Sequence, residues 1–279
     1  MKFISDGHHF LKVKNGGRLF VVVYPKGSSR GGLQVIFRRW GHTAKTALEE
    51  AASQVMRNME QQILFEDREI IVCHKPAGMA VQSAGVGRMD LESALKNYLG
   101  SPQLYVIHRL DQPVEGVIVF AKTQTAAREL SRQISCGKMK KEYLAVTTGR
   151  TQADQGTLEN ELKKDGRTNT SYVVKKGTPG AKTARLSYEI VKKLGREADN
   201  GAVPRYLVRV HLETGRHHQI RVQMAHAGMP LAGDRKYHPE DSSGLTLGLC
   251  AVRLGFYHPK TKKYMEFETV PQGNAFQES

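Results

Sequence analysis

The chain has 279 residues, which is enough for one large domain or for one domain with a small appendage. Its 42 lysines and arginines exceed its 27 acidic residues, and the net charge of +15 indicates a polyanionic partner, most simply nucleic acid, although an anionic membrane or solubility alone also suits this charge. Three widely separated cysteines argue against a disulfide framework, and the sequence contains no apolar run of membrane-spanning length, so we expect a cytoplasmic protein without membrane contact.

Residues 1–60 predict a small basic appendage of unknown role. Ranges 18–24 and 33–38 have strand composition and are joined by a loop rich in glycine and serine. From about Thr43, apolar residues recur at helical spacing. The Arg-Arg-Trp sequence at 38–40 could contact RNA, but a solvated basic edge is the preferred interpretation. We therefore predict a β-β-α appendage over 1–60 and a main domain over 61–279.

The main domain is predicted to begin with short strands and two helices. Strands are expected near Ile63 and at 70–73, 104–107 and 117–121. Asp90 has the position of a helix N-cap, and a second helix over 125–135 ends at Gly137. Helical spacing predicts the inward residues as Leu91, Ala94, Leu95 and Tyr98 in the first helix and Ala127, Leu130 and Ile134 in the second.

The second half of the chain is richer in strands. Strands predicted at 142–149, 184–194 and 205–213 enclose a polar, glycine-rich region at 150–182. Several strands follow one another directly. This order favours an α+β fold with a large, mixed, mostly antiparallel sheet and flanking helices over a doubly wound α/β fold.

The stretch "HRLDQPVEGVIVFAKT", residues 108–123, places Asp111 just before an apolar strand. A carboxylate against a core strand must be paired, protonated or in use, because desolvating a lone charge is unfavourable. If residues 104–111 are extended, Arg109 and Asp111 share one face, and Gln112-Pro113 makes a turn at its end. A structural Asp–Arg pair that holds this turn explains the stretch equally well.

The segment at 213–237 contains a second cluster of polar residues. It predicts a helix that starts near Arg216 or His217, ends at Gly228 and buries Ile220, Met224 and Ala227.

The start of this helix is strongly basic. His217 and Arg221 are four residues apart and therefore face the same side. Such a cluster suits binding of a phosphate, or of a carboxylate by a bidentate guanidinium. A solvated basic helix end is the alternative, but it does not explain Gln219. The adjacent His217 and His218 lack metal-ligand spacing along a helix, so we predict no metal site.

Five segments in a fixed order resemble the motifs of the RluA-type pseudouridine synthases. The stretch at 108–116 is similar to that family's HRLD-x-x-x-x-G signature, and 215–237 to its GR-x-HQIR…G-x-P-x-x-GD-x-x-Y block. "KPAG" (75–78), "KKEYLAV" (140–146) and "LCAVRLGFYHP" (249–259) stand in the expected order. The likeness spans roughly 63–270. Residues 1–60 lie outside it and do not resemble the S4 RNA-binding domain that many relatives carry there.

The resemblance implies the pseudouridine synthase fold and an isomerase that converts uridine to pseudouridine in rRNA or tRNA. It implies Asp111 as the catalytic nucleophile, Arg221 as its ion-pair partner, Tyr143 as the residue that stacks on the target base and Leu249 as a pocket residue. The other predicted substrate-binding residues are Lys75, His108, Arg109, Gln112, His217 and Gln219.

Several of these residues have a structural alternative. Loop support is the preferred role of His108, and ordering of the Pro-Gly bend that of Lys75. Tyr143 and Leu249 could be ordinary core residues. The isomerisation moves ribose C1′ from N1 to C5 of the base without redox change or energy input, so we expect no cofactor. The sequence shows neither a P-loop nor a dinucleotide-binding glycine motif.

Two departures from the family pattern concern the same region. Val114-Glu115 stands where relatives usually have Thr-Ser, and Cys250 where they usually have a histidine. The altered loop keeps a non-catalytic RNA-binding protein or RNA chaperone as the alternative function. A glycosidase-like enzyme fits poorly, because it needs two carboxylates and Glu115 is the sole candidate for the second. RNA is the predicted partner, and a monomer is preferred although the sequence does not determine the oligomeric state.

Overall fold

The computed structural model describes residues 8–15, 18–25, 59–82, 89–151, 153–195 and 204–277. Its main-domain strands are β3 (Ile63–Glu66), β4 (Ile70–Lys75), β5 (Tyr105–Val106), β6 (Glu115–Ala121), β7 (Lys140–Thr147), β8 (Gln155–Asp165), β9 (Thr170–Val174), β10 (Lys182–Leu194), β11 (Arg205–Leu212), β12 (Leu249–Tyr257) and β13 (Tyr264–Glu268). The helices are α2 (Leu91–Leu99), α3 (Gln124–Ser135), α4 (Gln219–His226) and the short 3-10 helix η1 (Asn274–Phe276).

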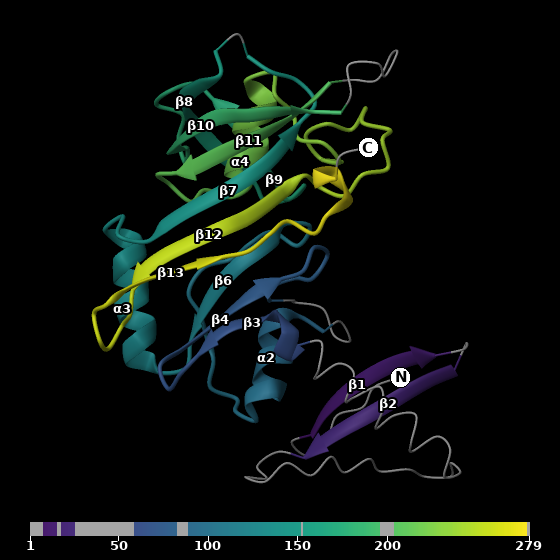
Figure 1. Cartoon of the computed structure of the whole chain (residues 1–279), viewed down its shortest axis with the longest axis vertical. Helices are drawn as coiled ribbons and strands as arrows, with labels where there is room; N and C mark the ends of the chain where they lie inside the picture. The colour runs from purple at the N-terminus through teal and green to yellow at the C-terminus, as the bar shows by residue number, and fades with distance from the viewer. Residues whose placement is uncertain are drawn as a thin grey trace.

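These strands form one sheet in the order β3-β4-β6-β12-β7-β11-β10-β8-β9, with β5 beside β6 and β13 beside β12 (Figure 1). Within the described residues, β6 and β12 are the parallel pair, and the other pairings are antiparallel. The predicted α+β fold with a large, mostly antiparallel sheet is confirmed.

Strand β6 is buried on both faces because it lies in the middle of the sheet. Ile118 and Phe120 face the same core as α2 and α4, whereas Val117 and Val119 face the core that α3 covers. A central strand covered on both sides accepts an uninterrupted apolar run. Helices α2 and α4 therefore share one face of the sheet.

The predicted cap of α2 is confirmed: the Asp90 side chain accepts a hydrogen bond from the Ser93 amide at 2.8 Å. The predicted inward stripe of α3 is confirmed at Leu130, and Ala127 and Ile134 pack against the same core but are only partly buried. Ala126 and Gln133 are the other buried residues of this helix. Gln133 lies inside because its amide group bonds both the N–H and the C=O of Tyr257, at 2.8 and 2.7 Å. A polar residue satisfied in this way takes the buried position that the apolar spacing assigned to Ile134, which is only partly buried.

The polar, glycine-rich region at 150–182, to which the sequence assigned no strand, is largely β-structure. It contains the whole β8–β9 hairpin, and β8 pairs with β10 as well. Along β8 exposed and partly buried residues alternate, because one face of this outer hairpin meets water. Its many polar residues hid the strand period of two.

The N-terminal region contains a separate hairpin of β1 (His8–Asn15) and β2 (Arg18–Pro25). The strand predicted at 18–24 is confirmed, and its partner is 8–15. The strand predicted at 33–38 and most of the predicted helix lie outside the described residues; residues 59–62 are helical. Among the residues that the structure describes, no helix is long and apolar enough to cross a membrane.

Candidate active site

The segment that carries Asp111 runs beside β6 without continuing the strand that precedes it. β5 comprises Tyr105 and Val106, so the strand predicted at 104–107 is shorter, and no paired strand continues to Asp111. His108 holds the segment in place, because its Nε2 accepts a hydrogen bond from the Val119 amide at 3.3 Å. Burial, with the charge of Lys141, lowers the pKa of His108 well below its usual value. A neutral, inward-facing His108 supports the loop rather than lining the site.

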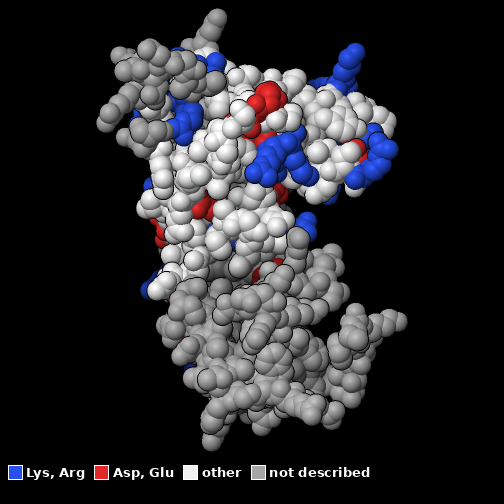
Figure 2. All heavy atoms as spheres, turned by 90° about the vertical axis from the view of Figure 1, so that its right-hand side faces the viewer, with Lys and Arg blue, Asp and Glu red and all other residues white. Residues whose placement is uncertain are grey.

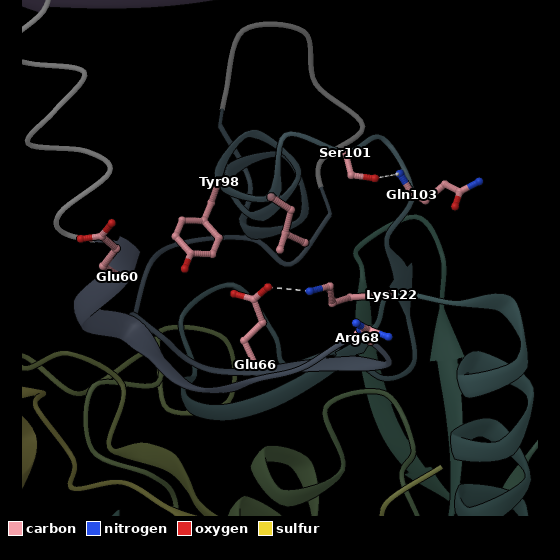
Figure 3. A pocket seen from close by; sticks show the side chains of 8 residues that line it. Glu60, Glu66, Arg68, Tyr98, Ser101, Gln103 and Lys122 are labelled. Carbon is pink, nitrogen blue, oxygen red and sulfur yellow. Dashed lines mark hydrogen bonds and ion pairs between the residues drawn. The ribbon is translucent and has the colours of Figure 1, made fainter. Parts of the chain in front are cut away.

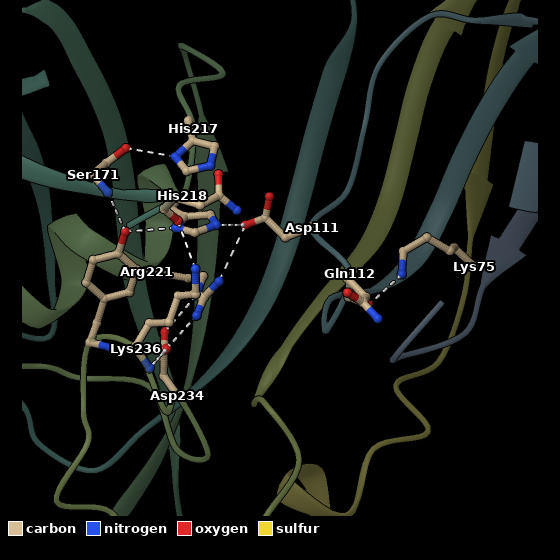
Figure 4. Close-up of polar contacts among 11 residues, drawn as sticks. Lys75, Asp111, Gln112, Ser171, His217, His218, Arg221, Asp234 and Lys236 are labelled. Carbon is tan, nitrogen blue, oxygen red and sulfur yellow. Dashed lines mark hydrogen bonds and ion pairs between the residues drawn. The ribbon is translucent and has the colours of Figure 1, made fainter. Parts of the chain in front are cut away.

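Lys75 also stabilises this loop, and it is fully buried, with 0% of its surface exposed. Its ammonium donates to the carbonyls of Pro76, Met79 and Gln112, at 3.0, 2.7 and 3.1 Å. Gln112 is bound to the same bend through its side chain, which donates to the Gly78 carbonyl at 3.0 Å. Lys75 therefore cannot contact substrate as predicted, because three backbone oxygens occupy its donors. In Figure 4, Lys75 and Gln112 lie apart from the cluster around Asp111.

Arg221 reaches Asp111 from a distant segment, as the predicted ion pair requires. Its Nη1 lies 3.8 Å from Asp111 Oδ2, which is an ion pair but too long for a hydrogen bond. The bidentate contact is made with Asp234 instead: Nε to Oδ2 is 2.8 Å and Nη2 to Oδ1 is 2.6 Å. The guanidinium is thus fixed by a buried carboxylate and presents its remaining nitrogen to Asp111.

Asp234 was not predicted as a site residue, although the Gly-Asp turn that contains it was visible in the sequence. Only 1% of its surface is exposed. Besides the Arg221 fork, it accepts a hydrogen bond from the Lys236 amide at 3.0 Å. Burial opposes the charge of Arg221, but the hydrogen bonds and charge of Asp234 outweigh it and raise the pKa of the guanidinium. The Arg221–Asp234 pair is the electrostatic anchor of the site.

Helix α4 starts later than predicted, and His218, which was not a predicted site residue, is the histidine beside Asp111. His218 is the N-cap, with a left-handed φ of 54°, and the helix begins at Gln219. His217 therefore lies outside the helix, and its four-residue spacing to Arg221 does not place the two on one face. His218 is the histidine beside the carboxylate, with Nε2 3.6 Å from Asp111 Oδ2.

A chain of hydrogen bonds fixes the tautomer of His218. The Tyr237 hydroxyl accepts from the Ser171 amide at 2.7 Å and lies 2.8 Å from His218 Nδ1. Because an ionised Asp111 carboxylate can only accept, Nε2–H faces it, and Nδ1 accepts the hydroxyl proton of Tyr237. Burial, then the charge of Arg221, lowers the pKa of His218 to about 3, so the ring is neutral at pH 7. It presents a dipole, not a charge, to the carboxylate.

His217 and Gln219 mainly contact other residues of the protein. His217 stacks on His218, with ring centroids 3.8 Å apart, and its Nδ1 lies 2.9 Å from Ser171 Oγ. Gln219 Oε1 accepts from the Thr214 hydroxyl and the Arg216 amide, at 2.8 and 2.9 Å. Gln219 thus stabilises the turn before α4, which accounts for a residue that a solvated helix end left unexplained.

A small cleft of about 70 Å³ opens above Asp111. The residues that line it come from the Asp111 loop, β7, β11, α4 and β12: Arg109, Leu110, Asp111, Val114, Tyr143, Leu212, His218, Gln219, Ile220, Arg221 and Leu249. Six of the predicted site residues are among them, and Lys75, His108, Gln112 and His217 are not. Tyr143 is 7% exposed and also belongs to the main hydrophobic core. Burial, then the charge of Asp111, raises the pKa of the Tyr143 hydroxyl.

The Asp111 side chain is 31% exposed, whereas that of Arg221 is 5% exposed. Burial raises the pKa of Asp111, and the charges of Arg221 and Lys75 oppose this effect. The carboxylate is therefore incompletely hydrated and has cationic neighbours, as a reactive group requires.

A larger groove lies elsewhere, along α2 and β3 (Figure 3). Its volume is about 500 Å³, and none of the predicted site residues lines it. Charges of both signs meet there, including the Glu66–Lys122 ion pair at 2.5 Å. The Asp111 cleft remains the candidate active site, because the perturbed carboxylate, guanidinium and histidine converge there.

Glu115 does not supply a second carboxylate to the cleft. It lies on the face of β6 opposite Ile118 and accepts hydrogen bonds from the backbone amides of Gln272 and Gly273, at 3.1 and 2.9 Å. Asp234, the other acid near Asp111, is occupied by Arg221. The arrangement lacks two free facing carboxylates among the described residues, which agrees with the poor fit to a glycosidase.

Lysine and arginine side chains gather in the upper part of the face shown in Figure 2. Near the cleft, Arg109, Lys164 and Lys236 are exposed. Their charges, after burial, help to lower the pKa of His217 to about 4. These three cations and His217 form the basic rim of the cleft.

Comparison with known proteins gives a consistent result. A family model described as RNA pseudouridylate synthase matches residues 69–226. The chain is 34% identical over 217 residues to tRNA pseudouridine synthase C of Haemophilus ducreyi, covering 73% of this chain and 88% of that protein. It is 31% identical over 243 residues to ribosomal large subunit pseudouridine synthase D of Yersinia pestis, covering 80% of this chain and 71% of that protein.

The solved structures add a likeness of fold. The structure of human RNA pseudouridylate synthase domain containing 1 matches with a TM-score of 0.62 and 23% identity, covering 75% of this chain and 83% of that one.

Proposed function

We propose, from the premise that this chain belongs to the RluA-type RNA pseudouridine synthases, that Asp111 is the carboxylate with which it isomerises uridine to pseudouridine. The reaction breaks the bond between ribose C1′ and N1 of the base and joins C1′ to C5. It requires an ionised carboxylate near the sugar, as nucleophile or base, in a site that limits water. The observation that carries the proposal is a 31% exposed carboxylate, 3.8 Å from a buried guanidinium, in a cleft whose walls include Tyr143 and Leu249.

Arg221 favours the ionised form of Asp111 against the effect of burial, and Asp234 keeps Arg221 oriented. A guanidinium held by two hydrogen bonds does not need to reorganise as charge moves in the reaction. The neutral His218 ring offers Nε2–H to the same carboxylate oxygen at 3.6 Å, and it can close to hydrogen-bond distance when substrate displaces water.

Tyr143 and Leu249 form the apolar walls that receive the base. Stacking on an aromatic ring is worth roughly 1–3 kcal/mol per base and offsets much of the few kcal/mol needed to flip a nucleotide out of a helix. Walls without directional hydrogen bonds also let the detached uracil turn before it is rejoined. The cleft of about 70 Å³ is smaller than the roughly 300 Å³ of typical ligand pockets, so the cleft has to widen when a nucleotide enters.

The basic rim supplies contacts to the RNA backbone. Arg109, Lys164 and Lys236 are exposed, and their positive charge suits the phosphates that flank a flipped nucleotide. We propose rRNA or tRNA as the substrate, which is supported by the names of the relatives that act on each. We further propose a cytoplasmic, monomeric enzyme that needs no cofactor, with residues 61–279 as the catalytic domain and 1–60 as an appendage.

Pseudouridine mapping of total RNA from cells with and without the gene tests this function. We expect at least one pseudouridine in rRNA or tRNA to disappear on deletion and to return with the wild-type gene. A gene encoding Asp111→Ala should not restore it, although the variant should bind RNA with nearly unchanged affinity. If no site is lost on deletion and the purified protein forms no pseudouridine in total RNA, the enzyme proposal fails and a non-catalytic RNA-binding protein is favoured.

A further inference from the structure

Glu115 is a buried carboxylate that the proposed reaction does not use. It begins β6, four residues after Asp111, and only 3% of its surface is exposed. Its Oε1 accepts hydrogen bonds from the amides of Gln272 and Gly273, at 3.1 and 2.9 Å, and its Oε2 accepts from Gln272 at 3.1 Å. A buried carboxylate needs such donors, because it has lost its hydration. The contact therefore attaches the end of the Asp111 loop to the segment 269–276, the C-terminal segment.

Three side chains meet at this point on the reverse face of the sheet, which is the face opposite the cleft: Glu115, Cys250 and His74. Cys250 is in register with Glu115 across the parallel β6–β12 pair, so the two departures from the family pattern are neighbours in space. Burial, then the charge of Glu115, raises the pKa of Cys250, which keeps its thiol protonated. His74 Nε2 lies 3.8 Å from Glu115, and His74 Nδ1 is 2.9 Å from the Thr269 hydroxyl. Glu115 and His74 thus both bind the C-terminal segment.

The same segment is attached to the other wall of the cleft. Asn274 Oδ1 accepts hydrogen bonds from the amide and the hydroxyl of Thr246, both at 2.8 Å. Thr246 stands three residues before Leu249, which lines the cleft. Ala275, which follows Asn274, is fully buried. The C-terminal segment therefore connects the Asp111 side of the cleft with its Leu249 side.

The strand start allows little independent movement of the loop. Gly116 has a φ of 126°, and a Cβ there would lie 2.3 Å from the Ala251 carbonyl oxygen, so β6 and β12 approach too closely for any side chain. Between this fixed point and Asp111 there is one turn, closed by the hydrogen bond from the Val114 amide to the Asp111 carbonyl at 3.0 Å. A shift of Glu115 is transmitted through this turn to Asp111.

We infer that Glu115 is a positioning residue: by binding the amides of Gln272 and Gly273 it ties the catalytic loop to the C-terminal segment and sets the place of Asp111 in the cleft. The inference rests on the proposed function for its catalytic consequence. It concerns orientation and not chemistry, because Glu115 faces away from the cleft. A displacement of about 1 Å at a reacting group lowers a rate by up to about a hundredfold.

Two substitutions test this contact from opposite sides. Glu115→Gln keeps the size of the side chain and removes the charge that the two amides stabilise. Gly273→Ala leaves the loop untouched, and its backbone angles of −63° and 143° suit alanine, but its Cβ would lie 2.9 Å from Thr246 Oγ1 and 3.2 Å from Glu115 Oε1. Each variant should lower the single-turnover rate constant by about tenfold to a hundredfold with unchanged RNA affinity. The double variant should be no slower than the more impaired single variant, because both changes break one contact.

Asp67→Asn is the matched control. Asp67 also accepts hydrogen bonds from two backbone amides, those of Glu69 and Ile70 at 2.8 and 2.9 Å, and contacts a buried histidine, His258, at 2.9 Å. It lies at the other end of β4, since Ile70 pairs with Ala121 while Lys75 pairs with Gly116. This variant should lose comparable thermal stability and keep its turnover rate. A control that slows turnover as much as Glu115→Gln would overturn the inference.

Hydrogen exchange of the 108–116 backbone gives a readout that needs no activity. Exchange should accelerate in Glu115→Gln and Gly273→Ala and stay unchanged in Asp67→Asn. Unchanged exchange in the first two variants overturns the positioning role. If the wild-type protein forms no pseudouridine, the proposed function fails, and the exchange pattern still decides whether Glu115 holds the loop.

Discussion

Replacing Arg221 by lysine separates charge from geometry in the candidate site. Lysine keeps the positive charge, but a single ammonium cannot reproduce the Nε and Nη2 bonds to Asp234, at 2.8 and 2.6 Å, while also facing Asp111. Hydrogen bonds to charged groups contribute about 1.5–3 kcal/mol each, and lysine retains one of the two. We therefore expect Arg221→Lys to lower the free energy of unfolding by about 1.5–3 kcal/mol.

The expected change in melting temperature follows from that free energy. Each kcal/mol shifts the melting temperature of a domain of this size class by about 2–4 °C, so a fall of roughly 3–12 °C is expected. Turnover should fall by about a hundredfold or more, because a preorganised donor near the reacting group is lost. Chemical denaturation measures the free energy of unfolding, and thermal unfolding measures the melting temperature. Single-turnover pseudouridine formation on the RNA identified by mapping measures turnover.

Arg253→Lys is the control for this experiment. Arg253 donates to Glu268 at 2.7 Å, but its side chain is 43% exposed, and such surface pairs contribute about 0–1 kcal/mol. Stability and turnover should both stay near the wild-type values. If Arg221→Lys retains wild-type turnover, the Asp234–Arg221–Asp111 arrangement does not serve the reaction. If it retains wild-type stability, the buried fork is not the anchor inferred here.

Asp111→Asn should abolish pseudouridine formation and leave the melting temperature equal or higher. The melting temperature should not fall, because burial raises the pKa of Asp111 and the ionised form therefore opposes folding at neutral pH. A lower melting temperature by calorimetry would contradict this. The turnover rate should fall as the pH is lowered through the raised pKa of Asp111. His218 should not contribute, because its pKa is lowered to about 3. A pH–rate profile from pH 4 to 8 that is flat, or that falls with histidine protonation near pH 6.5, would count against an Asp111-dependent step. Lys75→Met should lower the free energy of unfolding by about 2–4 kcal/mol, since three buried carbonyls lose a donor, and urea titration of the variant at pH 7 measures this.

Local patterns predicted those parts of the fold that depend on neighbouring residues. Asp90 caps α2 as expected, because an N-cap bonds an amide three residues away. The apolar run of β6 predicted a buried strand, since burial on both faces leaves no polar position. The β8–β9 hairpin was missed, because polar outer strands have a weak period. Gln133 was missed as an inward residue, because its partner is the backbone of Tyr257, far away in sequence.

The sequence by itself determined the family, the sheet-rich α+β class and the presence of Asp111, Tyr143, Arg221 and Leu249 in one cleft, because ordered motifs specify which residues a family site contains. Only the tertiary structure decided how they are held: Asp234 takes the Arg221 fork, His218 lies beside the carboxylate, and Glu115 turns to the reverse face. These contacts join segments far apart in the chain, and their partners depend on strand register and on where a helix begins. A shift of one or two residues changes which side chain faces the cleft, and the sequence pattern does not fix positions that finely.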